Sequence, residues 1–288
     1  MSRRNENGPM SIEAIVPDPN VPDLSRRVEG RDENGKIVTT RVVTERPLTI
    51  FLDDREIVSA MTIGDHPDLL AVGYLRNQAM LRSRDQIASI DVDDEAGIVV
   101  VRTHDTIDVS NKMRKRLRTS GCAQGTVFAD VMRDFERVAL PSGRTVRHSD
   151  LVALSGTIAN MPSLYLEAGA IHGAVLCSDR EVLAYFEDVG RHNAVDKIAG
   201  WMTMNGVAAS DKVFYTTGRL TSEMVIKTVM MGVPILASRS GFTAWGVDLA
   251  RRAGLTLIGR MKGKRLLVLS GEERVVFDRA RHEVEAAS

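Results

Sequence analysis

Apolar and polar positions begin to alternate regularly near Ile37, after a polar stretch interrupted by Pro17, Pro19 and Pro22. Residues 1–30 predict a disordered tail, because they offer few apolar side chains that could pack. Residues 31–145 predict a smaller, strand-rich α+β region. Its expected strands are 37–54, 55–63 and a hairpin over 87–103, and its expected helices are 64–81 and 126–138. In the first helix, Asp65 can act as the N-terminal cap and Pro67 lies in the first turn.

From residue 146 to 288 the pattern changes to strands that alternate with helices of 10–16 residues. The expected strands are 170–179, 180–188, 212–218, 233–239, 255–260 and 264–271, and the expected helices are 149–166, 191–206, 221–232 and 243–254. Such alternation is typical of an α/β fold in which helices cover both faces of one sheet. We therefore expect a second domain that is a three-layer α/β/α sandwich with largely parallel strands.

Composition narrows the classes of function. The 288 residues are 43% hydrophobic, which is enough for a sizeable core, and 38 basic residues balance 38 acidic ones. A chain without net charge is not a nucleic-acid polyelectrolyte, and 5% aromatic residues give little surface for base stacking. No apolar run has the length of a signal-peptide core or a membrane span. We expect a cytoplasmic protein with neither nucleic acid nor membrane as partner.

Four successive strands of the second domain are followed by turns that carry arginine with glycine in or beside them. In open α/β sheets ligands bind at the carboxyl ends of the strands. Glycine lets the backbone approach a ligand closely, and a guanidinium group can bind phosphate in a bidentate manner. The pattern predicts a cleft for a polyanion such as a nucleotide or dinucleotide, although neither GxxxxGK[ST] nor GxGxxG occurs. The four turns are Asp188–Asn193, Gly218–Arg219, Ser238–Gly241 and Arg260–Arg265.

Several polar residues near these turns have both a structural and a functional interpretation. His192 follows Gly-Arg at a helix start, where the helix dipole would lower its pKa and favour neutral imidazole. His172 lies in an apolar strand and is as well explained as a core histidine. Glu223 and Lys227 have the spacing of an ion pair on a helix surface, and the neighbouring pair 196–197 is also compatible with a helix surface.

The chain has two cysteines, Cys122 and Cys177, too few for a disulfide scaffold or a four-cysteine zinc site. Cys177 ends an apolar strand and is interpreted as structural. Cys122 lies in a Ser-Gly-Cys-Ala-Gln-Gly loop between a cationic segment and a helix start, and both features favour thiolate. The segment has five cations in seven positions, namely Lys112, Arg114, Lys115, Arg116 and Arg118.

The surroundings of Cys122 limit its chemistry. A cysteine phosphatase would need arginine at position 128, where this chain has phenylalanine, and a dithiol motif would need cysteine at position 125, where it has glycine. A single loop thiolate suits carrying a group, including a sulfur atom accepted from a persulfide. No spacing of histidines and cysteines indicates a metal site.

Three stretches together resemble the formate dehydrogenase accessory sulfurtransferase family (FdhD): GAIHGAVLCSDREVLAYFEDVGRHNAVDKIAG, TTGRLTSEMVIK and the SGC loop. The resemblance spans about residues 37–270. It implies a cytidine deaminase-like α/β/α sandwich after a smaller N-terminal region, usually in a homodimer. It also implies a sulfurtransferase that accepts sulfur from a cysteine desulfurase as a cysteine persulfide. The sulfur then passes to the molybdenum cofactor, as bis(molybdopterin guanine dinucleotide), for use by formate dehydrogenase.

Through this resemblance Cys122 matches the persulfide cysteine. The segment Arg260, Met261, Lys262, Gly263, Lys264 and Arg265 matches the family's cofactor-binding stretch, and Arg191, His192, Gly218 and Arg219 fall within its characteristic motifs. With Ser238 and Arg239 of the remaining turn, these residues form the predicted cofactor site.

The chain departs from the family pattern in two places. Many members carry Cys-x-x-Cys in the loop, whereas Cys122 stands alone here, and the SRSGFTAWG segment differs from an Ala-Pro-Thr/Ser form. Two other classes of function stay open on the sequence alone. One is a hydrolase or deaminase that uses a metal or a base at His172 or His192, and the other is a cofactor chaperone in which Cys122 is incidental.

Overall fold

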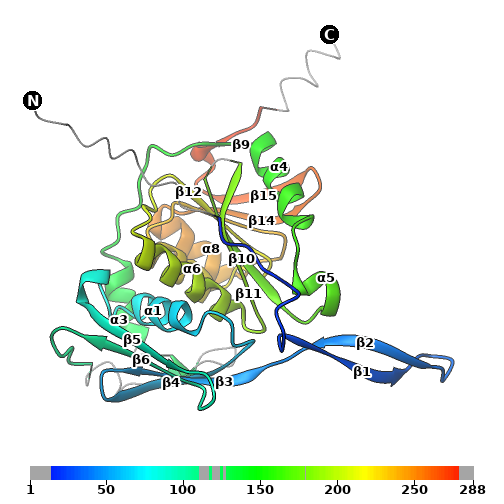
Figure 1. Ribbon diagram of the computed structural model, residues 1–288. Helices are drawn as coiled ribbons and strands as arrows, with labels where there is room; N and C mark the ends of the chain where they lie inside the picture. The colour runs from blue at the N-terminus through cyan, green and yellow to red at the C-terminus, as the bar shows by residue number, and fades with distance from the viewer. Residues whose placement is uncertain (1–13, 110–116, 119–123, 126–127, 179, 279–288) are drawn as a thin grey trace, which may run out of the picture.

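The computed structural model describes residues 14–109, 117–118, 124–125, 128–178 and 180–278. Its centre is a six-stranded sheet in the order β11-β10-β12-β13-β14-β15 (Figure 1). The strands are β10 (His172–Ser178), β11 (Glu181–Asp188), β12 (Lys212–Thr216), β13 (Ile235–Ser238), β14 (Thr256–Lys262) and β15 (Arg265–Ser270). All six were expected from the hydrophobic pattern, with boundaries within a few residues.

The sheet is mixed, and the expectation of largely parallel strands is wrong in this respect. Only the pairs β12–β13 and β13–β14 are parallel, whereas β10 is antiparallel to both its neighbours and β15 is antiparallel to β14. For the pairs β10–β11 and β14–β15 the connection of two residues explains the direction, because a strand that follows its neighbour so closely must reverse. Even so, β11, β12, β13 and β14 all run the same way, so their carboxyl ends meet at one edge.

Helices cover both faces of this sheet. On one face, α6 (Arg191–Asn205), α7 (Ser222–Met230) and α8 (Ala244–Ala253) pack on alternate strand residues such as Leu176 and Phe214. On the other face, α4 (His148–Ala159) packs on the intervening residues, such as Val175 and Val213. The arrangement agrees with the α/β class, and the cytidine deaminase-like assignment stays a prediction.

The helix expected over residues 149–166 is divided in two. After α4, Met161 and Pro162 leave the helical path, and a short α5 (Leu164–Ala168) begins at Ser163, whose hydroxyl accepts a hydrogen bond from the Tyr165 N–H. Proline lacks an N–H and disfavours helix in the residue before it, which accounts for the break. The break matters for function, because α5 and the link to it stand beside the sheet edge.

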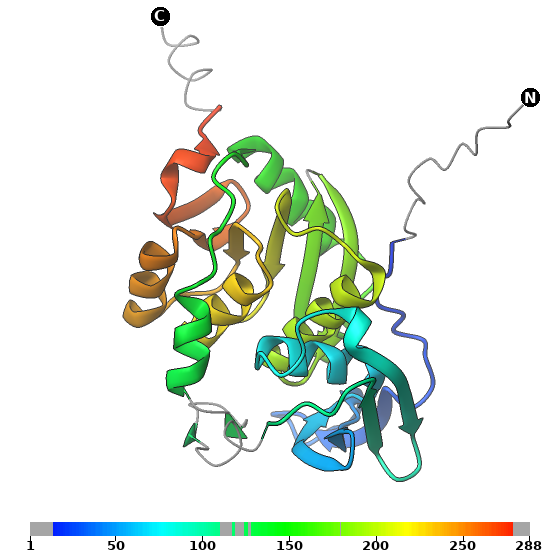
Figure 2. The same cartoon turned by 90° about the vertical axis from the view of Figure 1, so that its left-hand side faces the viewer.

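The N-terminal unit has its own four-stranded sheet, in the order β4-β3-β6-β5, beneath the larger sheet in Figures 1 and 2. A core that includes Ile50, Leu75 and Val101 lies between this sheet and α1. Among the described residues, the elements are β3 (Arg46–Leu52), β4 (Arg55–Thr62), α1 (Pro67–Asn77), the 3-10 helix η1 (Arg84–Gln86), β5 (Ile87–Asp93) and β6 (Ile98–Thr103).

The two units meet where α1 crosses α6, and two glycines permit the contact. A Cβ atom at Gly73 would lie 1.6 Å from the carbonyl oxygen of Asp196, and one at Gly200 would lie 2.0 Å from the carbonyl oxygen of Leu69. Such distances exclude any side chain at either position. The backbones of the two helices therefore touch directly, and the N-terminal unit is held against the α/β unit.

The remaining elements are short or peripheral. Strands β1 (Ser25–Arg31) and β2 (Ile37–Val43) form a two-stranded ribbon that extends from the body in Figure 1, so residues 25–30 are not part of a tail as expected. Residues 1–13 lie outside the described residues. The other elements are β7 (Leu117–Arg118), β8 (Gln124–Gly125), α3 (Phe128–Phe135), β9 (Val146–Arg147), the 3-10 helix η2 (Glu272–Arg274) and β16 (Val275–Val276). Within the described ranges, no helix has the length and hydropathy needed to span a membrane.

The helix crossing gives a direct test of how the units are joined. Replacing Gly200 by alanine puts a methyl group into the backbone of α1, so we expect the free energy of unfolding to fall by about 2–3 kcal/mol in urea denaturation. Gly156 is the matched control, since a Cβ there meets nothing within 4 Å inside α4. Gly156→Ala should raise stability by up to about 1 kcal/mol. Equal effects of the two substitutions would contradict the close crossing.

Candidate functional site

Three of the arginines predicted from strand ends converge around His172, the first residue of β10. Burial lowers the pKa of His172, and the positive charges of Arg191, Arg239 and Arg219 lower it further, in that order. The strand register gives the reason: His172 pairs with Asp188 at the end of β11, and the ends of β12 and β13 lie alongside, so the arginines that follow these three strands leave the sheet at one edge. This edge is the one at which β11, β12 and β13 end, as the sequence predicted. Arg260 is not among the groups that shift His172, and its guanidinium instead lies over the Phe242 ring, 5.3 Å from the centroid.

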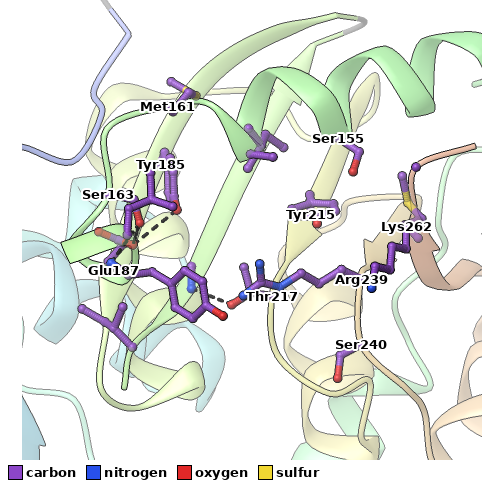
Figure 3. Close-up of a pocket in the computed structure, with 18 residues that line it drawn as sticks. Ser155, Met161, Ser163, Tyr185, Glu187, Tyr215, Thr217, Arg239, Ser240 and Lys262 are labelled. Carbon is purple, nitrogen blue, oxygen red and sulfur yellow. Dashed lines mark hydrogen bonds between the residues drawn. The ribbon is translucent and has the colours of Figure 1, made fainter. Parts of the chain in front are cut away.

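A pocket of about 520 Å³ opens at this edge, on the face of the sheet that α4 and α5 cover (Figure 3). Four of the predicted cofactor residues line it, namely Arg239, Met261, Lys262 and Gly263. Met261 is buried, whereas Arg239 and Lys262 are exposed at the rim. The Arg239 guanidinium stacks over the Tyr165 ring of α5, 4.6 Å from its centroid, which holds the cation in place.

The opposite end of the pocket contains a buried carboxyl group that the sequence analysis missed. Glu187, near the end of β11, is 2% exposed. It accepts hydrogen bonds from the Ser163 hydroxyl, from the Leu164 N–H at 2.8 Å and from the Tyr185 hydroxyl at 3.3 Å. Burial raises the pKa of Glu187, and these donors only partly counteract it. Figure 3 shows Glu187 across the pocket from Arg239 and Lys262. The pocket thus suits a ligand with N–H donors at one end and an anionic group at the other.

The other predicted residues support this pocket or stand beside it. The Ser238 hydroxyl donates to the Gly218 carbonyl at 2.7 Å and accepts from the Ser240 N–H at 2.9 Å, which joins two of the turns. A Cβ at Gly218 would lie 3.1 Å from the Arg191 side chain, so glycine there gives that arginine room. Arg219, Lys264 and Arg265 are exposed and do not line the pocket.

His192 is buried at the start of α6, where the sequence placed it. Its Nε2 lies 2.9 Å from the Glu223 carboxylate. Burial lowers the pKa of His192 more than the hydrogen bond with Glu223 raises it, so the neutral imidazole is favoured. The expected direction is confirmed, although burial rather than the helix dipole is its main cause.

The expected surface pair of Glu223 with Lys227 is wrong. Glu223 turns to His192, and Lys227 reaches Asp196 of α6, with contacts of 2.7 and 2.6 Å to the two carboxylate oxygens. Asp196 is 1% exposed and also accepts from the Asn77 side chain of α1 at 2.7 Å. The i,i+4 spacing is compatible with an ion pair on a helix surface. Because α7 is buried against α6, however, Glu223 and Lys227 each bind a residue of α6 instead.

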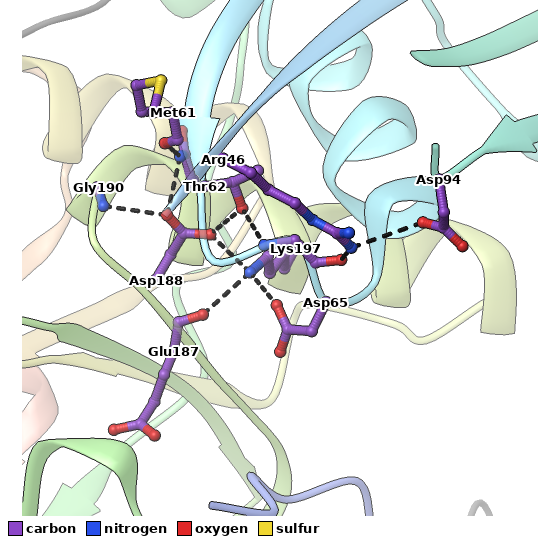
Figure 4. A network of polar contacts seen from close by, with 11 residues as sticks. Arg46, Met61, Thr62, Asp65, Asp94, Glu187, Asp188, Gly190 and Lys197 are labelled. Atoms are coloured by element: carbon purple, nitrogen blue, oxygen red, sulfur yellow. Dashed lines mark hydrogen bonds and ion pairs between the residues drawn. The ribbon is translucent and has the colours of Figure 1, made fainter. Parts of the chain in front are cut away.

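Lys197 is the centre of a second buried network (Figure 4). Although fully buried, its ammonium group contacts Asp188 at 2.6 Å, Asp65 at 2.5 Å and the Glu187 carbonyl at 3.0 Å. Burial lowers the pKa of Lys197, but the two carboxylates outweigh it and raise the pKa overall. The surface position that the sequence suggested for residues 196–197 is therefore wrong. Asp65 does not cap α1 but pairs with Lys197.

Asp188 links this network to the turn that begins α6. One carboxylate oxygen accepts from the Gly190 N–H at 3.0 Å and the Asn193 side chain at 2.9 Å, and the other accepts from the Thr62 hydroxyl of β4. Because successive strand residues face opposite sides of a sheet, Glu187 points into the pocket while Asp188 points to Lys197. Two adjacent acids thus serve the pocket and the joint between the units.

The two cysteines have different environments. Cys177 is fully buried in the core beneath α4, and burial raises the pKa of its thiol, so its structural interpretation is confirmed. Cys122 and most of its cationic neighbours lie outside the described residues. Within the described ranges, no group of three or more His, Cys, Asp or Glu residues is placed to hold a metal ion.

The chain is similar to known proteins over most of its length. The model of the FdhD/NarQ family matches residues 43–276, which is most of the chain. The chain is 31% identical over 257 residues to the sulfur carrier protein FdhD of Listeria innocua, covering 88% of this chain and 98% of that protein. It is 30% identical to the sulfur carrier protein FdhD of Bacillus subtilis over 249 residues, covering 85% and 95%.

A solved structure is also similar. The crystal structure of a formate dehydrogenase accessory protein from Desulfotalea psychrophila superimposes with a TM-score of 0.71 at 26% identity, covering 88% of this chain and 98% of that one. The family match over residues 43–276 includes the strand ends, the pocket and both buried networks. On this evidence the chain belongs to the FdhD/NarQ family.

Proposed function

We propose that this protein is a sulfur carrier, a sulfurtransferase that accepts sulfur on Cys122 and delivers it to the molybdenum cofactor required by formate dehydrogenase. The names of its relatives, sulfur carrier protein FdhD and formate dehydrogenase accessory protein, support the general role.

One observation carries the assignment of the sulfur-bearing residue. The chain has two cysteines, and Cys177 is 0% exposed with a thiol whose pKa burial raises. A thiol that is neither accessible nor ionised cannot exchange sulfur with a partner protein. Cys122 is therefore the one candidate, and the five cations at positions 112–118 would stabilise its thiolate. A second cysteine in the loop, which many family members have, is not needed for this step.

Loading is a thiol exchange that balances without an oxidant. The Cys122 thiolate attacks the terminal sulfur of a persulfide on the donor, which we propose is a cysteine desulfurase. The donor's S–S bond breaks, its cysteine leaves as a thiolate, and a new S–S bond forms at Cys122. The donor is thereby restored, and the sulfur is held on this protein as a persulfide.

The pocket at the sheet edge is the proposed site for the acceptor, the bis(molybdopterin guanine dinucleotide) form of the cofactor, which is a substrate here. Arg239 and Lys262 would meet phosphate, and Glu187 would accept hydrogen bonds from N–H groups of a base. A volume of about 520 Å³ suits one end of such a molecule rather than all of it. We propose that the remainder extends toward Arg191, Arg219 and the exposed residues Lys264 and Arg265, which do not line the pocket.

We further propose that the protein works in the cytoplasm as a homodimer. A reducing compartment keeps a lone loop cysteine as a thiol, which loading requires. Formate dehydrogenase is the proposed final partner, because it uses the cofactor that receives the sulfur.

Mass spectrometry of the intact protein tests the loading step. Incubation with a cysteine desulfurase and cysteine should add one sulfur, about 32 Da, because the Cys122 thiolate accepts a sulfur atom by exchange. The gain should be absent in Cys122→Ala and retained in Cys177→Ala. Reduction with dithiothreitol should remove it. A gain that survives in Cys122→Ala, or no gain on the unaltered protein, would contradict the proposal.

Calorimetric titration with guanosine diphosphate tests the pocket. Replacing Arg239 by alanine removes a charge-assisted contact with phosphate, so we expect the Kd to rise about tenfold or more. Arg180→Ala is the matched control, since Arg180 is exposed and pairs with Asp150 away from the pocket. The outcome against the proposal is equal affinity in the two variants.

A further inference from the structure

A groove that the sulfur-transfer site does not use lies at the end of α6 opposite to His192. It consists of two adjoining hollows of about 730 and 100 Å³. They share Arg76 of α1, Met202 and Thr203 of α6, and Val207. None of the residues that line these hollows lines the pocket at the sheet edge. The groove is thus a separate feature, bounded by α1, η1, α6 and the end of α7.

The walls of the groove are rich in methionine. Met202 and Met204 come from α6, Met230 ends α7 and Met231 follows it. The first is buried and the others are partly exposed. Methionine is unbranched and polarisable, so a surface of this kind adapts to apolar side chains of varied shape. The walls therefore suit an apolar side chain of a partner.

The rim of the groove is cationic. Arg76, Arg82 and Arg84 line it, and Asp85 is the only acid among the described lining residues. No ion pair joins any of the three arginines to a carboxylate within the described part of the chain. Arg76 is half-buried and donates to the Leu81 carbonyl at 3.3 Å. Burial lowers the pKa of Arg76, so a carboxylate from a partner would offset an existing cost.

The position of the groove relates it to the Cys122 segment. Helix α3 begins at Phe128, six residues after Cys122. Its residues Val131, Met132 and Phe135 belong to the same hydrophobic cluster as Met202, Met230 and Met231. Helix α3 also packs directly against α7, whose last residue Met230 lines the groove, so a protein held there would lie near the helix that follows the sulfur-bearing segment.

We propose that this groove docks an acidic segment of the sulfur-donating protein, with an apolar side chain seated among the methionines and carboxylates on the three arginines. The inference rests on the proposed function, because it names the partner of the loading step. Charge complementarity favours a protein segment over a nucleic acid, since a polyanion of phosphates would leave the methionine walls without apolar contacts.

Loading kinetics with two sulfur donors test the docking role. Protein loading uses a cysteine desulfurase with cysteine, while glutathione persulfide supplies sulfur without docking and serves as the reference for each variant. In the variant Arg82→Glu/Arg84→Glu, the KM for this protein in the desulfurase reaction should rise about tenfold, because attraction of an acidic segment becomes repulsion. The rate of loading from glutathione persulfide should not change. Added salt should raise the desulfurase KM of the unaltered protein, because it screens the attraction. The difference in KM between the unaltered protein and the double variant should therefore become smaller.

Lys36→Glu/Arg147→Glu is the matched control, with the same change of net charge at two exposed positions outside the groove. Its KM should stay within twofold of the unaltered protein. Equal KM values for the two double variants would overturn the docking role while leaving sulfur transfer intact. The docking role would also be overturned if Arg82→Glu/Arg84→Glu kept the desulfurase KM of the unaltered protein but bound single-stranded RNA more weakly. That result would assign the groove to nucleic acid. No persulfide from either donor on the unaltered protein would instead contradict the proposed function itself.

Discussion

The contact between α1 and α6 is the constraint on which the rest of this structure depends. Gly73 and Gly200 let the two backbones touch. Beside this crossing, the consecutive residues Asp196 and Lys197 form three ion pairs, Asp196 with Lys227 and Lys197 with both Asp188 and Asp65. Removing one partner of a buried pair costs about 3–5 kcal/mol, because the remaining charge stays buried without compensation. These pairs do not simply add stability, since apolar residues of similar volume can do as well. The contacts that position the N-terminal unit relative to the strand ends are the Asp65–Lys197 pair and the hydrogen bonds that Asn77 and Thr62 donate to Asp196 and Asp188.

The end of β11 shows how one short sequence serves two purposes. Strand geometry sends Glu187 into the pocket and Asp188 to Lys197, and the Lys197 ammonium also binds the Glu187 carbonyl. The pocket wall and the joint between the units are thus held by the same backbone. A movement of the N-terminal unit would therefore shift the end of β11. The wall of the pocket is coupled to the N-terminal unit through Lys197 and Asp65.

The sequence predicted most of the fold because apolar periodicity reports which face of an element is buried. It also placed Arg191, Arg219 and Arg239 at one sheet edge, since strands that run the same way end together. It did not reveal the partners of Asp196, Lys197 and Lys227, because an i,i+4 spacing looks the same on a surface and in an interface. Glu187 was missed for a related reason: an acid within an apolar strand was the available signal, but only the packing of α5 shows that it is enclosed. The expectation of largely parallel strands was wrong for the pairs β10–β11 and β14–β15, because the length of the connection, not periodicity, sets the relative direction of successive strands.

Formate dehydrogenase activity in cells that lack their own copy of this protein tests the sulfur-carrier role most directly. Cells are supplied with the unaltered chain, Cys122→Ala or Cys177→Ala at matched protein levels, and the enzyme is assayed in extracts. The unaltered chain and Cys177→Ala should restore activity, since the Cys177 thiol is buried and burial raises its pKa. Cys122→Ala should leave activity at the level of the empty cells. Restored activity with Cys122→Ala would show that no sulfur travels through this residue and would favour a role in holding the cofactor alone.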